Sequence, residues 1–588
     1  MIGRRRVVVK TRIVKLKGLG AARAHLNYVQ RDGVTRDGEP GRLYDGSRDE
    51  ADGKAFLERS EGDRHQFRFI VSPEDGAELE DQKPFVRGLM AQMEKDLDTQ
   101  LDWVAVDHFN TDNPHSHIVL RGKDEHGQDL VIARDYIAYG VRERASELLT
   151  LELGPVSELQ IQQGFAREVD QERFTRLDRE LIGQTERDVV DLRHDPPDRF
   201  GRFKHTLKIG RLQKLERMGL AEPAGPKRWR LSATLETTLR DMGTRGDIIR
   251  TMHRELRSVG LERTGIDHAI FDPSQTSARI VGKVLAHGLS DELNDRHYLI
   301  VDGTDGRTHY AEAGELIDPG DVRPGAIVAV EGKATEPRRA DRTIAGVAEQ
   351  SGGRYSDALH RAADPRASDE YVRSHVRRLE AMRRAGFAER IADGSWSIPK
   401  NFLDRADAYE DRKRMQQPAR LVVLSSLGLE QMGDAHGATW LDRQLTAERP
   451  EPLRATGFGR EAQHAIEHRR RWLLTQGLAE ERDGRTVYPR HLLRELQRRE
   501  VATTTERLSK ELGKPFNEPM DGERIEGTYR RPLRLASGKF ALIEQSKEFT
   551  LVPWRKTLER QRGQVIAGVV RGSSVSFEFG KKRGLGIG

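Results

Sequence analysis

The stretch "DHFNTDNPHSHIVLRG" (residues 107–122) places three histidines on two short apolar segments that flank a turn. Side chains alternate between the two faces along a strand, so His108 shares a face with Val106, and His115 shares a face with His117. The intervening "NTDNP" predicts a tight turn and therefore a β-hairpin. Such a hairpin can bring all three imidazoles to one point, which requires an antiparallel sheet with these strands side by side.

The segments around this hairpin alternate between predicted strands and predicted helices. Strand-like alternation occupies residues 6–16 and 65–73, and helical periodicity occupies residues 20–33, 83–100 and 133–154. These elements predict an α+β domain over residues 1–165, with a central antiparallel sheet and flanking helices.

The histidines are candidate metal ligands. The chain has 588 residues and no cysteine, so it has no disulfide, and any metal must be held by His, Asp or Glu. Three neutral imidazoles on one face of a rigid sheet form a facial site with positions left open for substrate. Such a site suits Mg²⁺, Mn²⁺ or another divalent ion that acts on phosphate oxygens. The alternative is that the three histidines only make structural hydrogen bonds.

Tyr28 is the candidate nucleophile. It lies on the predicted helix after the first strand and is flanked by Arg23 and Arg31. A phenol can attack a phosphodiester, form a covalent phosphotyrosine and release a 3′-hydroxyl. Three other tyrosines of the domain are rivals: Tyr44, Tyr136 and Tyr139.

Three motifs carry a family resemblance. "HLNYVQRDG", "FRFIVSPEDG" and "DHFNTDNPHSHIVLRG" resemble motifs I, II and III of the conjugative relaxases, the HUH endonucleases of the MOBP group that includes the VirD2-like relaxases. The order, tyrosine before histidines, also matches, and the resemblance covers about residues 6–155. The remainder, including "FTLVPWR" (549–555), resembles the long VirD2-like mobilization proteins, whose additional C-terminal domain has a poorly described function.

The resemblance implies roles for individual residues. The motif I tyrosine, Tyr28, is the nucleophile, and the motif II serine, Ser72, contacts DNA near the cut. The motif III histidines bind the metal: His108, His115 and His117.

One position departs from the family pattern. Asn110 stands where many relatives have aspartate, and an amide is neither a proton acceptor nor a charged ligand. Asp107 or Asp112 therefore carries that role, or it is absent. His108 or Asp107 could help to deprotonate Tyr28.

The implied activity is that of a relaxase, a site- and strand-specific DNA endonuclease and transesterase. It would nick one strand at a transfer origin of a plasmid or integrative element, stay covalently bound to the 5′ phosphate, and pilot or rejoin that strand during conjugation. The expected partners are single-stranded and duplex DNA, relaxosome accessory proteins and a type IV secretion coupling protein. The expected location is the bacterial cytoplasm, followed by transfer with the DNA into the recipient cell.

Two alternatives remain open. A rolling-circle replication initiator or transposase uses the same nuclease chemistry but commonly carries a helicase or a paired second tyrosine, and the chain contains no GxxxxGK(S/T) pattern. A non-catalytic DNA-binding protein with several winged units is the alternative from another class.

Basic residues near the motifs are the candidate phosphate contacts. The chain is 33% charged with a net charge of +6, so its basic residues matter through their local clustering. No apolar run approaches a membrane span, and the opening "MIGRRRVVVKTRIVKL" is too charged for a secretory signal, so no membrane insertion is expected. The candidate DNA-binding residues, besides Ser72, are Arg4, Arg5, Arg6, Lys10, Arg12, Lys15, Arg23, Arg31 and Arg121.

An internal repeat follows the first domain. Segments from residues 211, 375 and 468 each contain a basic helix, a Gly-(Leu/Phe)-Ala-Glu stop, a turn, an aromatic strand residue and another helix. That order is typical of winged-helix units, and their arginines predict a basic face on each helix. The alternative is three unrelated pieces of similar composition.

The expected domains are a HUH nuclease domain (1–165), a first winged-helix-like unit (166–265), a small β-barrel-like unit (266–350), winged-helix-like units 2 and 3 (351–505), and a C-terminal β-rich unit with a basic tail (506–588).

Overall fold

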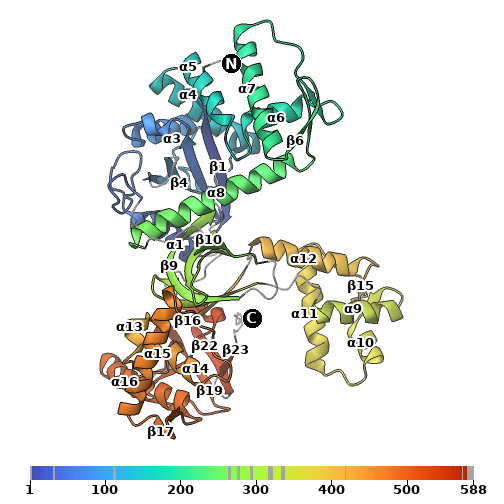
Figure 1. Cartoon of the computed structure of the whole chain (residues 1–588). Coiled ribbons are helices and arrows are strands. Elements are labelled where there is room, and N and C mark those ends of the chain that lie inside the picture. Colours follow the sequence, from blue (N-terminus) through green and yellow to red (C-terminus); the bar gives the residue numbers. More distant parts are fainter. Residues whose placement is uncertain are drawn as a thin grey trace, which may run out of the picture. The chain divides into compact units, whose positions relative to one another are not determined.

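The computed structural model divides into two compact units (Figure 1): Met1–Arg250 with Asp291–Asp295, and Thr251–Ser290 with Arg296–Gly588. The residues that the structure describes are 3–16, 18–30, 34–109, 114–261, 267–273, 279–291, 294, 296–314, 322–332, 338–391, 393–416, 419–571 and 574–578.

A four-stranded antiparallel sheet forms the centre of the N-terminal domain, with the strand order β1-β2-β4-β3. The prediction of an α+β architecture with antiparallel strands is confirmed. The strands are β1 (Val7–Lys15), β2 (His65–Pro73), β3 (Trp103–His108) and β4 (His115–Arg121). The helices are α1 (Leu19–Val29), α2 (Gly53–Arg59), α3 (Lys83–Leu97) and α4 (Val141–Leu153), with the short turns η1 (Gly76–Glu78) and η2 (Tyr136–Gly140).

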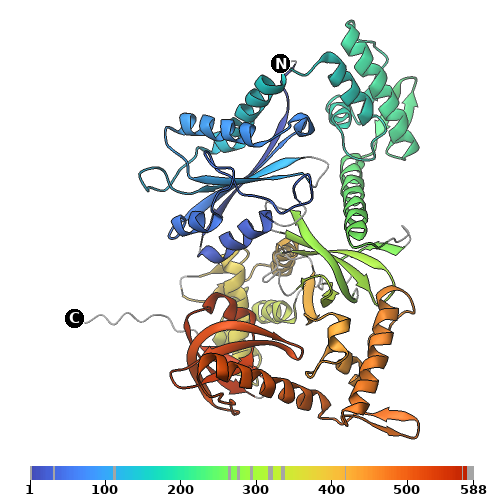
Figure 2. The same cartoon turned by 90° about the vertical axis from the view of Figure 1, so that its left-hand side faces the viewer.

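Helices cover both faces of this sheet (Figure 2). On one face, Trp103 and Ala105 of β3 belong to a core that includes residues of α3 and α4. On the other, Val104 and Val106 belong to a core that includes residues of α1 and α2. The first four residues of β3, Trp103 to Val106, are all apolar because both faces of the strand are buried there.

The first repeat has its own small core around a three-stranded sheet of order β5-β7-β6. The helix α5 precedes it and crosses the domain boundary expected at residue 165. The elements are α5 (Glu158–Glu168), α6 (Arg176–Gly183), β5 (Val189–Asp191), α7 (Arg199–Arg217), β6 (Ala221–Gly225), β7 (Arg228–Leu231) and α8 (Leu235–Ser258).

The second repeat has a three-stranded sheet of order β13-β15-β14 and, compared with α6 to α8 of the first repeat, an additional helix, α10, after its first strand. We expected it to begin at residue 351, but Ile344 and Val347 of the preceding helix lie in its core with Trp396. The elements are α9 (Arg339–Gln350), β13 (Arg354–Tyr355), α10 (Asp357–Ala363), α11 (Asp369–Arg384), β14 (Glu389–Arg390), β15 (Trp396–Ser397) and α12 (Phe402–Gln416).

The third repeat has the two-stranded sheet β17-β18. Leu473 and Leu478 lie in its core, and Tyr488 packs against them. The elements are α13 (Leu429–Met432), α14 (Trp440–Thr446), α15 (Gly457–Thr475), β17 (Glu480–Arg482), β18 (Arg485–Val487) and α16 (Leu492–Leu512).

Each repeat contains a buried arginine at the same position, eight residues before its Gly-(Leu/Phe)-Ala-Glu stop, and each arginine binds a buried aspartate. The pairs are Arg211–Asp178, Arg378–Asp341 and Arg469–Asp442, each with 2.8 Å between the closest atoms. The aspartate also accepts the backbone N–H at the start of its own helix. The arginines expected on an exposed basic face therefore include three that are core residues.

The first and third repeats share the rest of this network as well. Arg211 donates to the carbonyls of the residues nine, seven and five positions before Asp178, and Arg469 donates to the carbonyls at the same three offsets from Asp442. The same three relative positions therefore supply the carbonyls in two segments that are more than 250 residues apart. This agreement supports the description of the two segments as copies of one unit.

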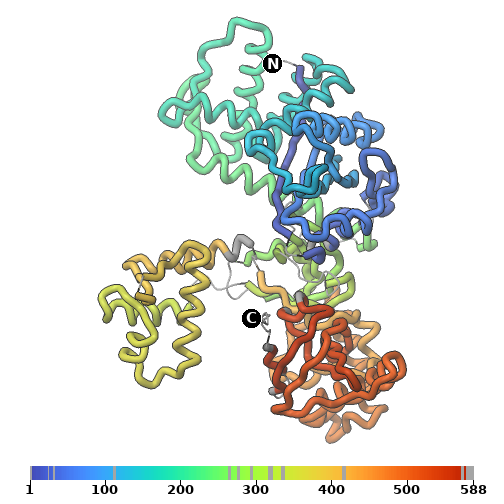
Figure 3. Tube along the Cα trace, turned by 180° about the vertical axis from the view of Figure 1, so that it is seen from behind, coloured from blue at the N-terminus to red at the C-terminus, as the bar shows by residue number. Residues whose placement is uncertain are grey.

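A six-stranded sheet of order β16-β12-β9-β10-β11-β8 belongs to the second unit. The strand β16 follows the second repeat in the chain, and its Arg420 pairs with Glu331 of β12. The whole second repeat is therefore inserted between two neighbouring strands of this sheet. The inserted second repeat can be followed along the tube in Figure 3. The strands are β8 (His268–Ile270), β9 (Arg279–Asp291), β10 (Arg296–Gly303), β11 (Thr308–Gly314), β12 (Ile327–Glu331) and β16 (Arg420–Ser425).

A five-stranded sheet of order β21-β20-β19-β22-β23 lies near the C-terminus. The basic tail predicted after it falls outside the described residues. Among the helices that the structure describes, none is long and apolar enough to cross a membrane. The elements are β19 (Arg524–Leu535), β20 (Gly538–Glu544), β21 (Phe549–Pro553), η5 (Lys556–Gln561), β22 (Val565–Arg571) and β23 (Ser574–Glu578).

Candidate metal centre

The hairpin of β3 and β4 brings the three predicted histidines together. His108 pairs with His115 across the hairpin, and Val106 pairs with His117, so the three rings share one face. Their ring centroids are 4.3 to 5.3 Å apart, and one ligand atom from each ring lies within 4.8 Å of the others. All three side chains are buried. This cluster could hold a metal ion.

The backbone fixes the tautomer of His108. Its Nε2 lies 2.7 Å from the carbonyl oxygen of Val29, and a carbonyl only accepts, so Nε2 carries the proton and donates it. The Nδ1 atom then has the lone pair that a metal ligand needs. Ligand histidines commonly donate their other N–H to a carbonyl in this way, so the donor set fits a metal.

The same hydrogen bond places the end of α1 against the cluster. Val29 is the last residue of α1, and Tyr28 directly precedes it. Tyr28 is half-buried and packs against the core that also contains Val29 and Val106. The predicted nucleophile is therefore on the helix whose C-terminal carbonyl contacts the predicted metal ligand His108.

The rival tyrosines have other environments. Tyr44 is fully buried in the core on the opposite face of the sheet, and its burial raises the pKa of its phenol well above the ordinary value. Tyr136 donates to Asp96 at 2.8 Å, and burial, followed by this hydrogen bond, also raises its pKa. Tyr139 is 57% exposed on η2. Of these tyrosines, Tyr28 is the one that packs on the histidine face.

The structure does not bring Asp107 to the histidines. Its side chain points to the opposite face, where its Oδ1 accepts hydrogen bonds from Tyr44 (2.7 Å) and Ser116 (2.6 Å). Burial raises the pKa of the Asp107 carboxyl, against the lowering effect of these hydrogen bonds. This position does not suit the base for Tyr28 that we considered from the sequence. Asn110 and Asp112 fall outside the described residues.

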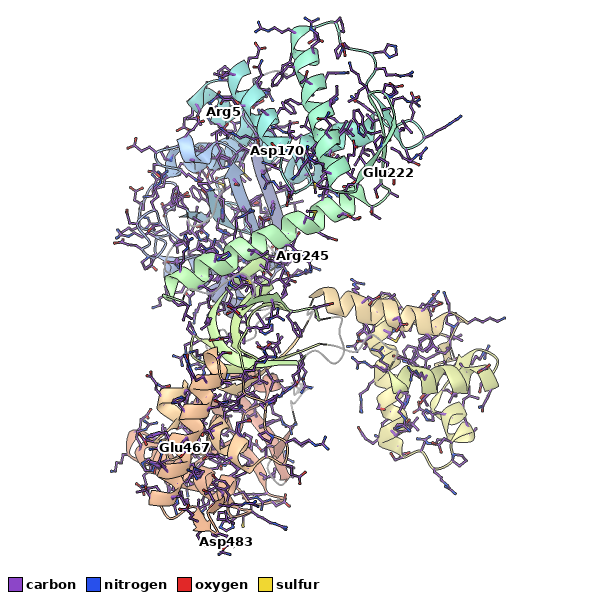
Figure 4. All side chains as sticks on the ribbon, in the orientation of Figure 1. Arg5, Asp170, Glu222, Arg245, Glu467 and Asp483 are labelled. Atoms are coloured by element: carbon purple, nitrogen blue, oxygen red, sulfur yellow. The ribbon has the colours of Figure 1, made fainter. Side chains whose placement is uncertain are left out.

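Two of the predicted DNA-binding arginines are structural. Arg5, labelled in Figure 4, is 4% exposed and contacts Asp75 at 2.7 Å and the carbonyl of Gly154 at 2.9 Å. Arg121 binds Asp63 with two hydrogen bonds of 3.0 Å. Neither guanidinium is available to a DNA phosphate without breaking these contacts.

Other predicted residues lie on the histidine face of β1 and β2. Lys10 pairs with Ile70, which pairs with His117, so these three side chains form one row across the sheet. Ser72 is two residues further along β2 on the same face, with its hydroxyl 3.3 Å from the carbonyl of Pro114. Arg12 is in the adjacent row. Lys10 is exposed, and Ser72 and Arg12 are half-buried.

The remaining predicted basic residues are dispersed. Arg4 and Arg6 are exposed and pair with Glu147 and Glu74, each at 3.2 Å. The exposed Lys15 lies on the opposite face of β1 from Lys10, and Arg23 is exposed on α1. Arg31 falls outside the described residues.

Sequence reasoning missed Arg68 and the carbonyl of Val29. Arg68 is a buried β2 residue that pairs with Arg12 and Val119 on the histidine face. Strand alternation from Ile70 could have placed it there, because it is two residues away. A backbone carbonyl has no sequence signal, so the contact between His108 and Val29 could not have been predicted.

A family model of proteins of unknown function, DUF3363, matches residues 208–586, which is well over half of the chain. The chain belongs to the DUF3363 family. No curated protein and no solved structure matches it.

The DUF3363 segment begins within α7 and extends into the last residues of the chain. It covers the second and third repeats and both large sheets of the second unit, and the histidine cluster lies outside it. The description of the family assigns no function, so a function for the N-terminal domain depends on its own site.

Proposed function

We propose that this chain is a relaxase of the HUH type, which nicks one DNA strand by metal-dependent tyrosine transesterification. The observation that carries the proposal is the buried cluster of His108, His115 and His117 beside the end of the helix that bears Tyr28. The resemblance of the three motifs to those of the conjugative relaxases, with the tyrosine before the histidines, supports the same assignment.

The chemistry assigns a task to each group. Tyr28 loses its phenolic proton and its Oη atom attacks the scissile phosphorus, so that an Oη–P bond forms and the P–O3′ bond breaks. The 3′ oxygen takes up one proton and leaves as a hydroxyl, so the proton lost by the phenol is balanced. The three imidazoles hold a divalent cation, Mg²⁺ or Mn²⁺, which when bound neutralises charge on the non-bridging phosphate oxygens. The resulting phosphotyrosine retains the energy of a phosphodiester, so the reverse reaction rejoins the strand.

The DNA strand lies, in this proposal, along the histidine face of β1 and β2. Lys10 and Arg12 supply positive charge and Ser72 a hydroxyl on that face, in or next to the row that contains His117. Contacts of this kind hold phosphates without reading bases. The sequence of the origin must then be recognised elsewhere in the chain or by a partner protein.

The cellular setting follows from the relaxase assignment. The substrate is a transfer origin on a plasmid or integrative element, and the enzyme acts in the bacterial cytoplasm before it accompanies the strand into the recipient. Relaxosome accessory proteins and a type IV secretion coupling protein are the proposed partners.

A second candidate function is non-catalytic DNA binding by the repeats. It is favoured by the order helix, hairpin and helix that all three repeats contain, which is found in winged-helix units. Against it, several exposed arginines are already paired within their own helix, such as Arg383 and Arg384 with Glu380. In Figure 4 the labelled Glu467 marks a similar case, because it binds Arg470.

Covalent attachment to DNA tests the main proposal. Purified chain with Mn²⁺ and supercoiled DNA that carries its own origin is expected to nick one strand and to leave protein on the 5′ end, detected on denaturing gels. Tyr28→Phe is expected to abolish the adduct and to keep DNA binding. Tyr139→Phe, which removes an exposed phenol elsewhere in the domain, is the matched control and is expected to behave as the unsubstituted chain.

Two results would contradict the assignment. Adduct formation by Tyr28→Phe would mean that another residue is the nucleophile. DNA binding without any adduct in the unsubstituted chain would favour the non-catalytic function.

A further inference from the structure

A hydrogen-bonded network of the half-buried Asp107 with buried partners lies behind the histidine hairpin, on the face of the sheet away from the rings. The Asp107 carboxylate accepts from the Tyr44 hydroxyl at 2.7 Å and from the Ser116 hydroxyl at 2.6 Å. Tyr44 is 0% and Ser116 1% exposed. Asp107 directly precedes His108, and Ser116 lies between His115 and His117, so the network alternates with the candidate ligands along both strands.

The register of the hairpin connects the two faces. Asp107 and Ser116 are cross-strand partners, and they lie between the pair His108–His115 and the pair Val106–His117. A shift of one residue in pairing would turn every side chain of one strand to the other face. The hydrogen bond between Asp107 and Ser116 can form only in the register in which the three imidazoles converge.

Tyr44 connects this register to the rest of the domain. Its N–H donates to the carbonyl of Ala105 at 2.9 Å, and its carbonyl accepts from the N–H of Ala105 at 2.8 Å. The phenol then reaches Asp107, two residues along β3, and stacks edge-on against Trp103 with 6.2 Å between centroids. The Asp107 carboxylate is therefore held by Ser116 of its own hairpin and by Tyr44 of a separate segment. Two backbone hydrogen bonds with Ala105 fix Tyr44 beside β3.

Gln82, at the start of α3, extends the network. Its carboxamide is 0% exposed and lies 2.8 Å from the Ser116 hydroxyl. A serine hydroxyl has one hydrogen and cannot donate to both Gln82 and Asp107. In the structure Oε1 of Gln82 faces the Ser116 hydroxyl, which leaves Nε2 buried without an acceptor among the described residues. With the amide turned, Nε2 would donate to Ser116, and Ser116 would donate to Asp107.

We infer that Asp107 is a positioning residue of the histidine cluster: with Tyr44 and Ser116 it holds β3 and β4 in the register and twist that converge the three ring nitrogens on one ion. Asp107 touches neither substrate nor metal. The inference rests on the metal-binding part of the proposed function. It differs from the proton-accepting role that the sequence suggested, because the carboxylate acts through the backbone of the hairpin.

Metal affinity and geometry test this role in the full chain. Titration calorimetry with Mn²⁺ alone gives the Kd, and the visible spectrum of the Co²⁺-loaded chain reports the arrangement of the ligands. Asp107→Ala is expected to raise the Kd by about tenfold to a hundredfold, which is the usual effect of losing a group that orients metal ligands, and to shift the Co²⁺ bands. Asp107→Asn keeps an acceptor oxygen and is expected to restore both readouts toward those of the unsubstituted chain.

A matched control removes a buried carboxylate from the loop before β2, which also contacts this sheet. Asp63 binds Arg121 at the opposite end of β4 from the histidines. Asp63→Ala is expected to lower the Tm and to leave the Kd and the Co²⁺ spectrum unchanged. If Asp107→Ala does not fold, Tyr44→Phe and Ser116→Ala each remove one donor to Asp107, and each is expected to raise the Kd by a smaller factor.

Each contrary outcome has a distinct meaning. A folded Asp107→Ala chain with an unchanged Kd and spectrum overturns the positioning role and leaves metal binding by the histidines intact. If Asp63→Ala changes the Kd as much as Asp107→Ala does, the effect is a general loss of stability, and the inference is wrong. If the unsubstituted chain binds no Mn²⁺ or Co²⁺, the metal-binding proposal itself fails, and the inference fails with it.

Discussion

The histidine hairpin and the arginine cores of the repeats are both buried clusters of titratable side chains, but they pair their polar atoms differently. Arg469 has a carboxylate and three carbonyls around its guanidinium, and Arg211 has the equivalent set. In the hairpin, three side chains of the same kind face one another. Imidazoles that are all neutral bring lone pairs to a common point, and imidazoles that are all charged repel one another.

This difference separates a cluster with a structural role from a cluster that could hold an ion. A buried cation with a matching acceptor for its donors needs nothing from solution, and its role is to hold helices together. Three converging imidazoles could together hold a cation. Substitution of a buried arginine is therefore expected to destabilise its repeat, whereas substitution of a histidine is expected mainly to remove the stabilisation by a metal.

The largest effect is expected from the arginine cores. Arg469→Ala leaves Asp442 buried without its counter-charge, which is expected to cost about 3–5 kcal/mol of stability in the third repeat. Hydrogen exchange of peptides from α14 and α15 measures this loss locally. The control is Arg471→Ala on the same helix, whose side chain is 70% exposed and which is expected to change the exchange little. Equal effects of both substitutions would contradict a special role for the buried pair.

The next effect concerns the metal. A divalent ion at a hundred times its Kd is expected to stabilise the folded domain by about 2.7 kcal/mol, because it binds only the folded state. In His117→Ala this gain is expected to disappear, whereas the stability without metal changes less. Thermal unfolding with and without Mn²⁺ measures the gain. If Mn²⁺ raises the Tm of both His115→Ala and His117→Ala as much as that of the unsubstituted chain, these histidines are not the metal ligands.

The smallest effect is expected in the second repeat, which contains a buried pair of histidines that resembles the hairpin in part. Burial, followed by the neighbouring His375, lowers the pKa of His360. The folded state then binds fewer protons than the unfolded state. Stability is therefore full above the unfolded value of about 6.5 and falls as the pH decreases through it.

Hydrogen exchange of α10 and α11 between pH 7.5 and 5.5 measures this decline. In His360→Phe the dependence on pH is expected to flatten, because the titrating group is gone. A steeper dependence in the variant would mean that the decline has another origin.

Much of the hairpin could be predicted from the sequence, because strand alternation and turn residues are local signals. The same alternation would have placed Asp107 opposite to His108, since the two are adjacent. What the local pattern could not supply was its partner: Tyr44 is 63 residues away and lies on no predicted element. A short-range pattern therefore identified the ligands, whereas the group behind them required the fold.

The repeats show the opposite error. In the sequence, their arginines resemble a solvent-exposed basic face. The aspartates that bind Arg211, Arg378 and Arg469 are 33, 37 and 27 residues away along the chain, so no local pattern reveals these pairs. One signal was readable: Thr175 and Thr439 each precede an aspartate by three residues, the spacing of a capping box. That spacing predicts where a helix begins, but it does not predict that the same carboxylate also neutralises an arginine of another helix.

The pairing of Glu331 with Arg420 has a consequence for how the gene can change. The chain leaves the six-stranded sheet after β12 and re-enters it at the neighbouring strand position, so the ends of the intervening segment are only one strand spacing apart. A short turn can close the same gap. Deletion of the coding segment, or its exchange for a different compact domain, is therefore expected to leave the register of the surrounding strands unchanged. We therefore expect that related chains can gain, lose or replace the second repeat without a change in the rest of the six-stranded sheet.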